Sequence, residues 1–268
     1  MNQRILIRGG GDLASGVALR LHHAGFDVVI AELPRPLAVR RLVSFSEAVY
    51  AGQIFVEDAA ARLVTPDQIE STLARREIPV LVDPEISQLP ITNYQIIIDA
   101  RLLKTSPRPL PAPVPLHIGL GPGFTAPRDC HAVIETRRGH TLGRVYWQGG
   151  SAPDSGQPEG DPRRVLRADA DGTLVSHAAI GDHLEAGQLV AEIHSKIENR
   201  KIEIDSPFKG VLRGLLPDGM EVTRGLKLGD VDERDDPALC RLVSDKALAI
   251  GGGALEAILS FLHSSSLP

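Results

Sequence analysis

Cysteine and aromatic residues are scarce in this sequence of 268 residues, which has two cysteines and 4% Phe, Trp and Tyr. Cys130 and Cys240 lie far apart and form no Cys-x-x-Cys pair, so the sequence predicts neither a disulfide framework nor a cysteine metal site. Free thiols are typical of a reducing compartment, and we therefore expect a cytoplasmic protein. Because aromatic side chains are few, Leu, Val, Ile and Ala have to fill the core.

The sequence also has no excess of positive charge. The formal net charge is −5 at pH 7, whereas a nucleic-acid binder needs a basic surface. The first residues, Met1 to Arg4, run straight into a strand pattern, without the basic stretch and apolar core of a signal peptide. No apolar run reaches the roughly 20 residues of a membrane-spanning helix. We therefore predict neither a nucleic-acid partner nor a membrane partner.

Several motifs of catalysis and metal binding do not occur. The sequence has no His-Glu-x-x-His, no Gly-x-x-x-x-Gly-Lys-Ser/Thr and no Gly-x-Ser-x-Gly. His177, His183 and His194 follow no known ligand spacing. We therefore predict no metal site, and the sequence identifies no catalytic residue.

What is present is an alternation of strand and helix patterns in residues 1–105. Four short apolar runs, at 5–7, 28–31, 79–82 and 95–98, are typical of strands buried on both faces. Between the first two, residues 12–24 place Leu13, Val17 and Leu21 on one helical face, and residues 36–50 also predict one or two helices. Thr65-Pro66-Asp67-Gln68 is typical of a capped helix start. This pattern predicts an α/β fold with a Rossmann-like parallel sheet that binds a nucleotide.

The rest of the chain divides into three parts. Residues 106–164 begin with a proline at every second position from Pro107 to Pro115, which predicts an extended connector followed by a mixed β segment. Residues 165–236 alternate short runs with turn pairs such as Asp171-Gly172 and Asp218-Gly219, which predicts a small all-β module. Residues 237–268 contain an apolar helix pattern, which we expect to pack back on the first domain or on a partner.

The β module resembles a biotinyl/lipoyl-like barrel-sandwich hybrid. Two quasi-repeats carry the resemblance, one at residues 181–187 and one at residues 219–225. Carrier domains of that kind hold a modified lysine at a hairpin tip. Lys196 and Lys201 lie near this tip, but the flanking Glu-Ala-Met-Lys-Met pattern is absent. We therefore expect no covalent cofactor.

A glycine motif follows the first predicted strand. Gly9-Gly10-Gly11-Asp12-Leu13-Ala14 fits Gly-x-Gly-x-x-Ala, and Glu32 ends the next strand about 20 residues later. In a dinucleotide site, Gly9 permits the turn, Gly11 lets the backbone approach a phosphate, and Glu32 accepts from a ribose hydroxyl. The charge of Asp12 is unfavourable beside a pyrophosphate, and such glycines also form turns without a ligand. Nucleotide binding and a structural turn both remain open.

Further candidate residues follow other strands. Asp83 and Asp99 each end a strand, where they either line a ligand crevice or cap the next turn. Gly121 and Gly123 belong to a second glycine cluster, which forms either an anion-facing loop or a tight bend. His140 is either a general acid/base or a ligand, or it is a surface turn residue.

Taken as a whole, the chain resembles a YqeB-like family of accessory proteins in the selenium-dependent molybdenum hydroxylase system. The matching stretches are residues 7–18, 118–124, 133–144, 225–232 and 244–253. The resemblance implies a role in the maturation of molybdenum-containing hydroxylases, with such an enzyme as the client partner. It assigns no catalytic residue.

We therefore expect an accessory factor that binds NAD(P), a pterin dinucleotide or another nucleotide-containing cofactor at the loop Gly9 to Gly11. Glu32 would lie at the ribose, and the loops that bear Asp83, Asp99, Gly121, Gly123 and His140 would close the crevice. A ligand-free adaptor that docks a client enzyme and an NAD(P)-dependent oxidoreductase are the alternatives. A homo-oligomer is compatible with each of these.

Overall fold

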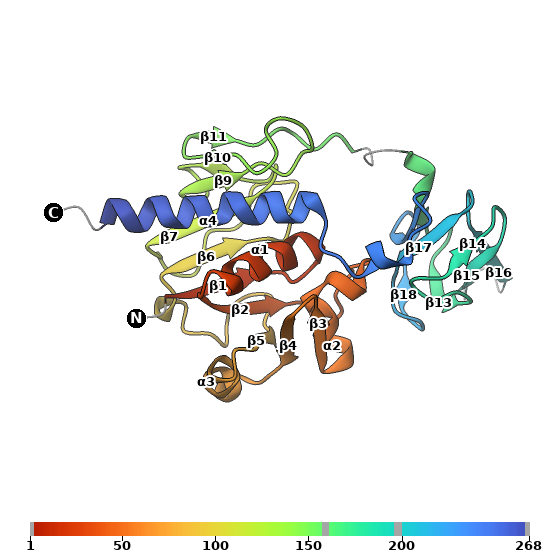
Figure 1. Cartoon of the computed structure of the whole chain (residues 1–268), viewed down its shortest axis with the longest axis horizontal. Coiled ribbons are helices and arrows are strands. Elements are labelled where there is room, and N and C mark those ends of the chain that lie inside the picture. Colours follow the sequence, from red (N-terminus) through yellow and green to blue (C-terminus); the bar gives the residue numbers. More distant parts are fainter. Residues whose placement is uncertain (1–2, 157–160, 196–199, 266–268) are drawn as a thin grey trace. The chain divides into compact units, whose positions relative to one another are not determined.

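The computed structural model describes residues 3–156, 161–195 and 200–265. The predicted hairpin-tip residue Lys196 lies outside this range. The chain forms two compact units, shown in Figure 1. Unit 1 comprises residues 1–36, 44–155 and 243–268, and unit 2 comprises residues 37–43 and 156–242.

Unit 1 is built on a nine-stranded sheet with the order β10-β9-β7-β6-β1-β2-β5-β4-β3. The pairs from β4 to β9 are parallel, whereas β3–β4 and β9–β10 are antiparallel. The strands are β1 (Arg4–Arg8), β2 (Asp27–Glu32), β3 (Gln53–Val56), β4 (Ala59–Leu63), β5 (Ile78–Val82), β6 (Ile96–Asp99), β7 (Leu116–Leu120), β9 (Ala132–Ile134) and β10 (Val145–Tyr146). A separate two-stranded sheet pairs β8 (Thr125–Ala126) with β11 (Gly149–Gly150).

The strand predictions at 5–7, 28–31, 79–82 and 95–98 are confirmed by β1, β2, β5 and β6, and helix α1 (Asp12–His23) confirms the first helix. The predicted Rossmann-like parallel sheet is nevertheless wrong. The sheet is mixed, and the connections from β5 to β6, from β6 to β7 and from β7 to β9 contain no α-helix. Buried apolar runs reveal strands, but they do not reveal how the chain returns to the sheet.

Few regular helices cover this sheet. The region predicted as one or two helices, residues 36–50, is divided into the 3₁₀ turns η1 (Arg41–Val43) and η2 (Phe45–Glu47) and the single turn α2 (Ala48–Ala51). The capped start at Thr65 is confirmed, because Thr65 and Gln68 form both hydrogen bonds of a capping box ahead of α3 (Ile69–Ala74). Unit 1 also contains the 3₁₀ turns η3 (Pro66–Gln68) and η4 (Ile91–Asn93), whereas η1 belongs to unit 2.

The C-terminal helix α4 (Asp245–Ser265) packs along α1 in unit 1, as Figure 1 shows. The segment Pro237–Ser264, which includes most of α4, is long and apolar enough to span a membrane by length and composition, with a mean hydropathy of 1.4 in an 18-residue window. The sequence pattern had predicted no such run. In this structure Ala247, Ile250, Ala254 and Ala257 of α4 are fully buried, as in a core helix of a globular unit. A cytoplasmic location stays a prediction.

Small residues allow α4 to pack closely on α1 and on the turn between β9 and β10. A Cβ atom on Gly16 would lie 2.6 Å from the Ala247 Cβ atom, and a Cβ on Gly253 would overlap the Gly143 carbonyl oxygen. Gly252, in the same helix, is exposed and has no atom within 4 Å of its Cβ position.

We therefore expect Gly16→Ala and Gly253→Ala to lower the free energy of unfolding by about 1–3 kcal/mol, because overpacking outweighs the gain in helix propensity. The matched control Gly252→Ala should raise it by roughly 0.5–1 kcal/mol. Chemical denaturation measures all three. Equal changes in the free energy of unfolding for Gly252→Ala and Gly253→Ala would contradict the close packing of α4 at Gly253.

Unit 2 contains two four-stranded antiparallel sheets around one apolar core. Their orders are β12-β19-β17-β14 and β16-β15-β13-β18. The elements are β12 (Val165–Arg167), β13 (Gly172–Ser176), β14 (His183–Leu184), β15 (Leu189–Ser195), β16 (Arg200–Asp205), β17 (Gly210–Leu215), β18 (Glu221–Val222), β19 (Lys227–Asp232), and the 3₁₀ turns η5 (Pro162–Arg164) and η6 (Pro237–Cys240).

The barrel-sandwich-hybrid prediction for this unit is also wrong. The strands form two separate sheets, and a segment from outside the predicted module completes the core. The Leu215 amide donates to the Val39 carbonyl at 2.9 Å, and the Val39 side chain is part of the apolar core. The quasi-repeats correspond to turns of the unit. They do not show that residues 37–43 contribute to its apolar core.

Candidate functional site

The bend between β1 and α1 is filled by protein groups. The Gly10 amide donates to the Glu32 Oε2 atom at 2.6 Å, and the Gly9 amide donates to the Ala31 carbonyl at 2.8 Å. Burial raises the pKa of the Glu32 carboxyl, and the two amide hydrogen bonds that it accepts, from Leu33 and Gly10, oppose this shift. The Gly9 and Gly10 amides and the Glu32 carboxylate are thus engaged within the protein.

The other residues of the glycine motif have structural positions. Gly11 is the N-cap residue of α1, and Asp12 is the first residue of the helix. The Asp12 carboxylate accepts a hydrogen bond from the Leu13 amide at 3.0 Å, and Ala14 is buried beneath the helix. Of the two interpretations of this motif, the hydrogen bonds favour the structural turn.

Asp83 caps the turn that follows β5. Its carboxylate accepts hydrogen bonds from the Ser87 and Gln88 amides, both at 2.9 Å. This is the second of the two roles that the sequence left open. Asp99 has a different environment, which is described below.

The second glycine cluster follows β7. Gly121 has a φ of +83°, and its amide donates to the Ile134 carbonyl at 3.1 Å. Gly123 lies so close to Leu103 that a Cβ atom would be 2.4 Å from the Leu103 carbonyl oxygen. His140 is exposed in the turn between β9 and β10. These residues lie in bends and turns of the chain. Their predicted role at a cofactor site stays a prediction.

The chain changes direction across the sheet at the pair β1–β6. The strand β2 lies on one side of β1, and β6 lies on the other, so the chain crosses over β1 after completing β5. In α/β proteins, ligands bind outside the carboxyl ends of the strands at such a switch point. The carboxyl ends of β1 and β6 here are Arg8 and Asp99.

Two arginines converge on one buried carboxylate at this point. Arg101 donates to Asp99 from Nε at 2.8 Å and from Nη2 at 2.5 Å. Arg8 Nη1 lies 3.4 Å from Asp99, and Arg8 Nη2 donates to the Pro84 carbonyl at 3.0 Å. Side-chain exposure is 1% for Asp99, 7% for Arg8 and 29% for Arg101, so Arg101 is the member that reaches solvent.

His117, on the neighbouring strand β7, completes what we call the switch-point cluster: Arg8, Asp99, Arg101 and His117. Burial lowers the pKa of His117 to about 4, so the imidazole is neutral at neutral pH. Burial also lowers the pKa of Arg8, while the charge of Asp99 opposes that shift. Within the described part of the chain, Arg8 Nε and His117 Nε2 are buried without a hydrogen-bond partner. The cluster therefore contains two buried nitrogen atoms whose hydrogen-bonding capacity is not satisfied by the described residues.

Backbone strain occurs in the two loops beside the cluster. Ile86 has a φ of +54° in the loop after β5, and Leu102 has a φ of +56° directly after Arg101. Non-glycine residues rarely adopt this conformation, and a β-branched residue such as Ile86 does so least readily. Strain of this kind concentrates at functional sites.

Sequence reasoning found Asp99 but missed its three partners. A signal was present, because Arg8 and His117 interrupt apolar runs that are otherwise typical of buried strands. A charged or titratable residue in such a position requires a partner. The partner itself depends on strand order, which the sequence did not predict. Across the described residues, no group of three or more His, Cys, Asp or Glu side chains is arranged to hold a metal ion.

The chain is 44% identical to YqeB of Escherichia coli (strain K12) over 267 residues. The YqeB-like resemblance is supported. The alignment covers 98% of this chain and 48% of the relative, so the chain spans about half the length of the curated relative that it matches. No protein-family model matches the sequence. The relative's name carries no link to a selenium-dependent molybdenum hydroxylase system.

Solved structures show only a distant likeness. An aspartoacylase family protein of Mesorhizobium loti is 14% identical, with 86% of this chain and 85% of that chain covered and a TM-score of 0.30. The apo form of the ectoine utilization protein EutE (DoeB) of Ruegeria pomeroyi is 11% identical, with 86% of each chain covered and a TM-score of 0.28. A succinylglutamate desuccinylase/aspartoacylase of Rhodobacter sphaeroides is 17% identical over 31% of this chain and 25% of that chain, with a TM-score of 0.24.

The predicted function is therefore wrong. The matched structures are named as aspartoacylase-type proteins and an ectoine utilization protein, not as molybdenum hydroxylase maturation factors or NAD(P)-dependent oxidoreductases. The amides of Gly9 and Gly10 and the carboxylate of Glu32 make hydrogen bonds within the protein. The cofactor-binding roles of the motif residues stay predictions. A client enzyme and a homo-oligomer stay predictions.

Proposed function

We propose that unit 1 binds a small carboxylate-bearing molecule at the switch-point cluster. One observation carries the proposal: Arg8 and Arg101 converge on the single carboxylate of Asp99 at the carboxyl ends of β1 and β6. The two guanidinium groups carry one more charge than the carboxylate that they share. A guanidinium group is planar and pairs with a carboxylate through two parallel hydrogen bonds.

Each member of the cluster has a part in this proposal. Arg101 is the anchor, because its side chain is partly exposed and its Nη1 atom makes no hydrogen bond to the described residues. Asp99 orients Arg101, and Arg8 neutralises Asp99 from the buried side. Neutral His117 adds a polar group without adding charge. A carboxylate is favoured over a phosphate because the neighbouring Gly9 and Gly10 amides are already engaged.

Thermal unfolding in the presence of acetate, succinate and benzoate tests the proposal. A ligand that binds the folded state at about 100 times its Kd stabilises the protein by about 2.7 kcal/mol, so at least one of these acids should raise Tm. Arg101→Gln should abolish the shift. The control Arg108→Gln, on the exposed connector, removes the same charge and should preserve it. If no acid shifts Tm, or if both variants lose the shift alike, the proposal fails.

A further inference from the structure

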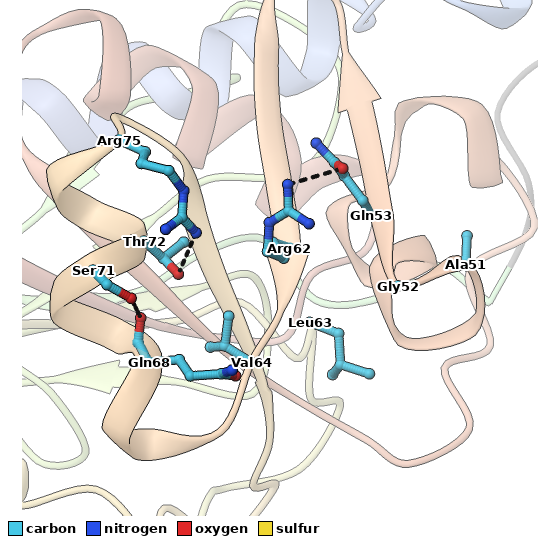
Figure 2. A pocket seen from close by; sticks show the side chains of 10 residues that line it. All are labelled: Ala51, Gly52, Gln53, Arg62, Leu63, Val64, Gln68, Ser71, Thr72 and Arg75. Atoms are coloured by element: carbon cyan, nitrogen blue, oxygen red, sulfur yellow. Dashed lines mark hydrogen bonds between the residues drawn. The ribbon is translucent and has the colours of Figure 1, made fainter.

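A polar depression lies between helix α3 and the β3–β4 hairpin, shown in Figure 2. We call it the arginine groove. Its volume of about 520 Å³ is within the range of small-molecule sites. Polar side chains come from both walls, with Arg62 and Gln53 on the hairpin and Arg75 and Ser71 on the helical side. The full lining is Ala51, Gly52, Gln53, Arg62, Leu63, Val64, Gln68, Ser71, Thr72 and Arg75.

Both arginines are held in place by neutral and acidic partners. Arg62 donates to the Glu77 carboxylate at 2.9 Å from Nε and to the side-chain Oε1 atom of Gln53 at 3.0 Å from Nη2. Arg75 donates from Nη2 to Thr72 Oγ1 at 3.2 Å and to Glu77 at 3.3 Å. Thr72 is fully buried, so its hydroxyl is a fixed support. The two guanidinium groups thus keep their orientation without a ligand, which reduces the entropy lost on binding.

The charges in the groove do not cancel. Arg62 and Arg75 share the single carboxylate of Glu77, and the Arg62 guanidinium holds the pKa of that carboxyl below its ordinary value. One positive charge therefore remains over the neutral pH range. The Nη1 atom of neither arginine makes a hydrogen bond to the described residues.

We propose that the arginine groove is a second binding site, separate from the switch-point cluster, for the oxyanion group of a small polar molecule. The free edges of Arg62 and Arg75 bind the anion, and the side chains of Gln53, Gln68 and Ser71 face its polar body. A phosphate monoester and a polycarboxylate share this chemistry, because both present oxygen acceptors in the geometry of a guanidinium fork.

Isothermal titration of the full chain with inorganic phosphate and with citrate tests this site and separates the two ligand types. Arg75→Gln and Arg62→Gln should each raise Kd about tenfold, the expected loss for a charge-assisted hydrogen bond. Arg76→Gln is the matched control. Arg76 is the next residue along the chain, it is exposed, and it contacts the His22 carbonyl and not the groove. Its Kd should stay within about twofold of the wild type, since only general electrostatics change.

Backbone NMR of the wild type gives a readout that does not depend on a variant. Bound phosphate should shift the amide signals of Ser71, Thr72 and Leu63 and leave those of Ala100 and Arg101 unchanged, and citrate should shift the same three signals in the Arg101→Gln variant, in which the switch-point cluster has lost its anchor. Equal weakening by Arg75→Gln and Arg76→Gln, or shifts spread over the whole surface, would overturn the proposal. Because Arg101→Gln does not touch the groove, it should leave binding here intact even if the switch-point cluster binds nothing.

Discussion

Replacing Asp99 with alanine should destabilise the protein by about 3–5 kcal/mol, far more than the loss of an exposed ion pair. Asp99 is fully buried and accepts hydrogen bonds from both Arg8 and Arg101. Without it, the guanidinium group of Arg8 is left buried beside a second positive charge. An uncompensated buried charge is far more costly than the net value of the pair that it came from. Denaturant unfolding at neutral pH measures the change.

An exposed ion pair provides the comparison. Arg4 binds Glu70 with two hydrogen bonds, at 2.7 and 2.9 Å, but the Glu70 side chain is 74% exposed. Glu70→Ala should therefore have a much smaller effect than Asp99→Ala. Adding Arg8→Met to Asp99→Ala should restore part of the lost stability, since it removes the unpaired charge. If the double variant is less stable than Asp99→Ala, the charge of Arg8 is not the cause.

Acid should destabilise the protein through His117. The pKa of this imidazole is about 4 in the fold because of burial, against 6.5 for an ordinary histidine. The unfolded chain therefore binds a proton at a higher pH than the folded chain, and the stability due to neutral His117 is lost as pH falls from about 6.5 to about 4. Between about pH 7 and about pH 4.5 this loss amounts to roughly 2 kcal/mol.

The His117→Gln variant isolates this contribution. Its free energy of unfolding should fall about 2 kcal/mol less than that of the wild type over the same pH interval, whatever its stability at pH 7. His140→Gln, at an exposed position, is the control and should follow the wild type. Parallel pH profiles for wild type and His117→Gln would show that His117 is not desolvated.

Sequence patterns predicted the elements better than their assembly. The runs at 5–7 and 28–31 became β1 and β2, and the capping box at Thr65 formed as expected, because these signals are local. The hairpin β3–β4 was missed, and so were the connections without helices. Strand order decides which side chains meet, so the meeting of Arg8 with Asp99, 91 positions later, was not readable from the sequence.

The glycine motif shows that a sequence pattern also does not predict the direction of a single side chain. Its spacing, its position after a strand and the distance to Glu32 all fitted a dinucleotide site. In this structure the Glu32 carboxylate reaches back to the Gly10 amide at 2.6 Å, which the spacing of the motif did not reveal. A sequence pattern fixes which residue follows a strand, but not whether its side chain turns outwards to a ligand or inwards to the chain.

The discontinuity of both units has a consequence for biosynthesis. Unit 1 is complete only when residues 243–268 have been added, since α4 covers the Gly16 face of α1. During translation, that apolar face stays open while the whole of unit 2 leaves the ribosome. We therefore expect the nascent chain to be prone to aggregation until α4 is added, because transiently exposed apolar surface promotes it.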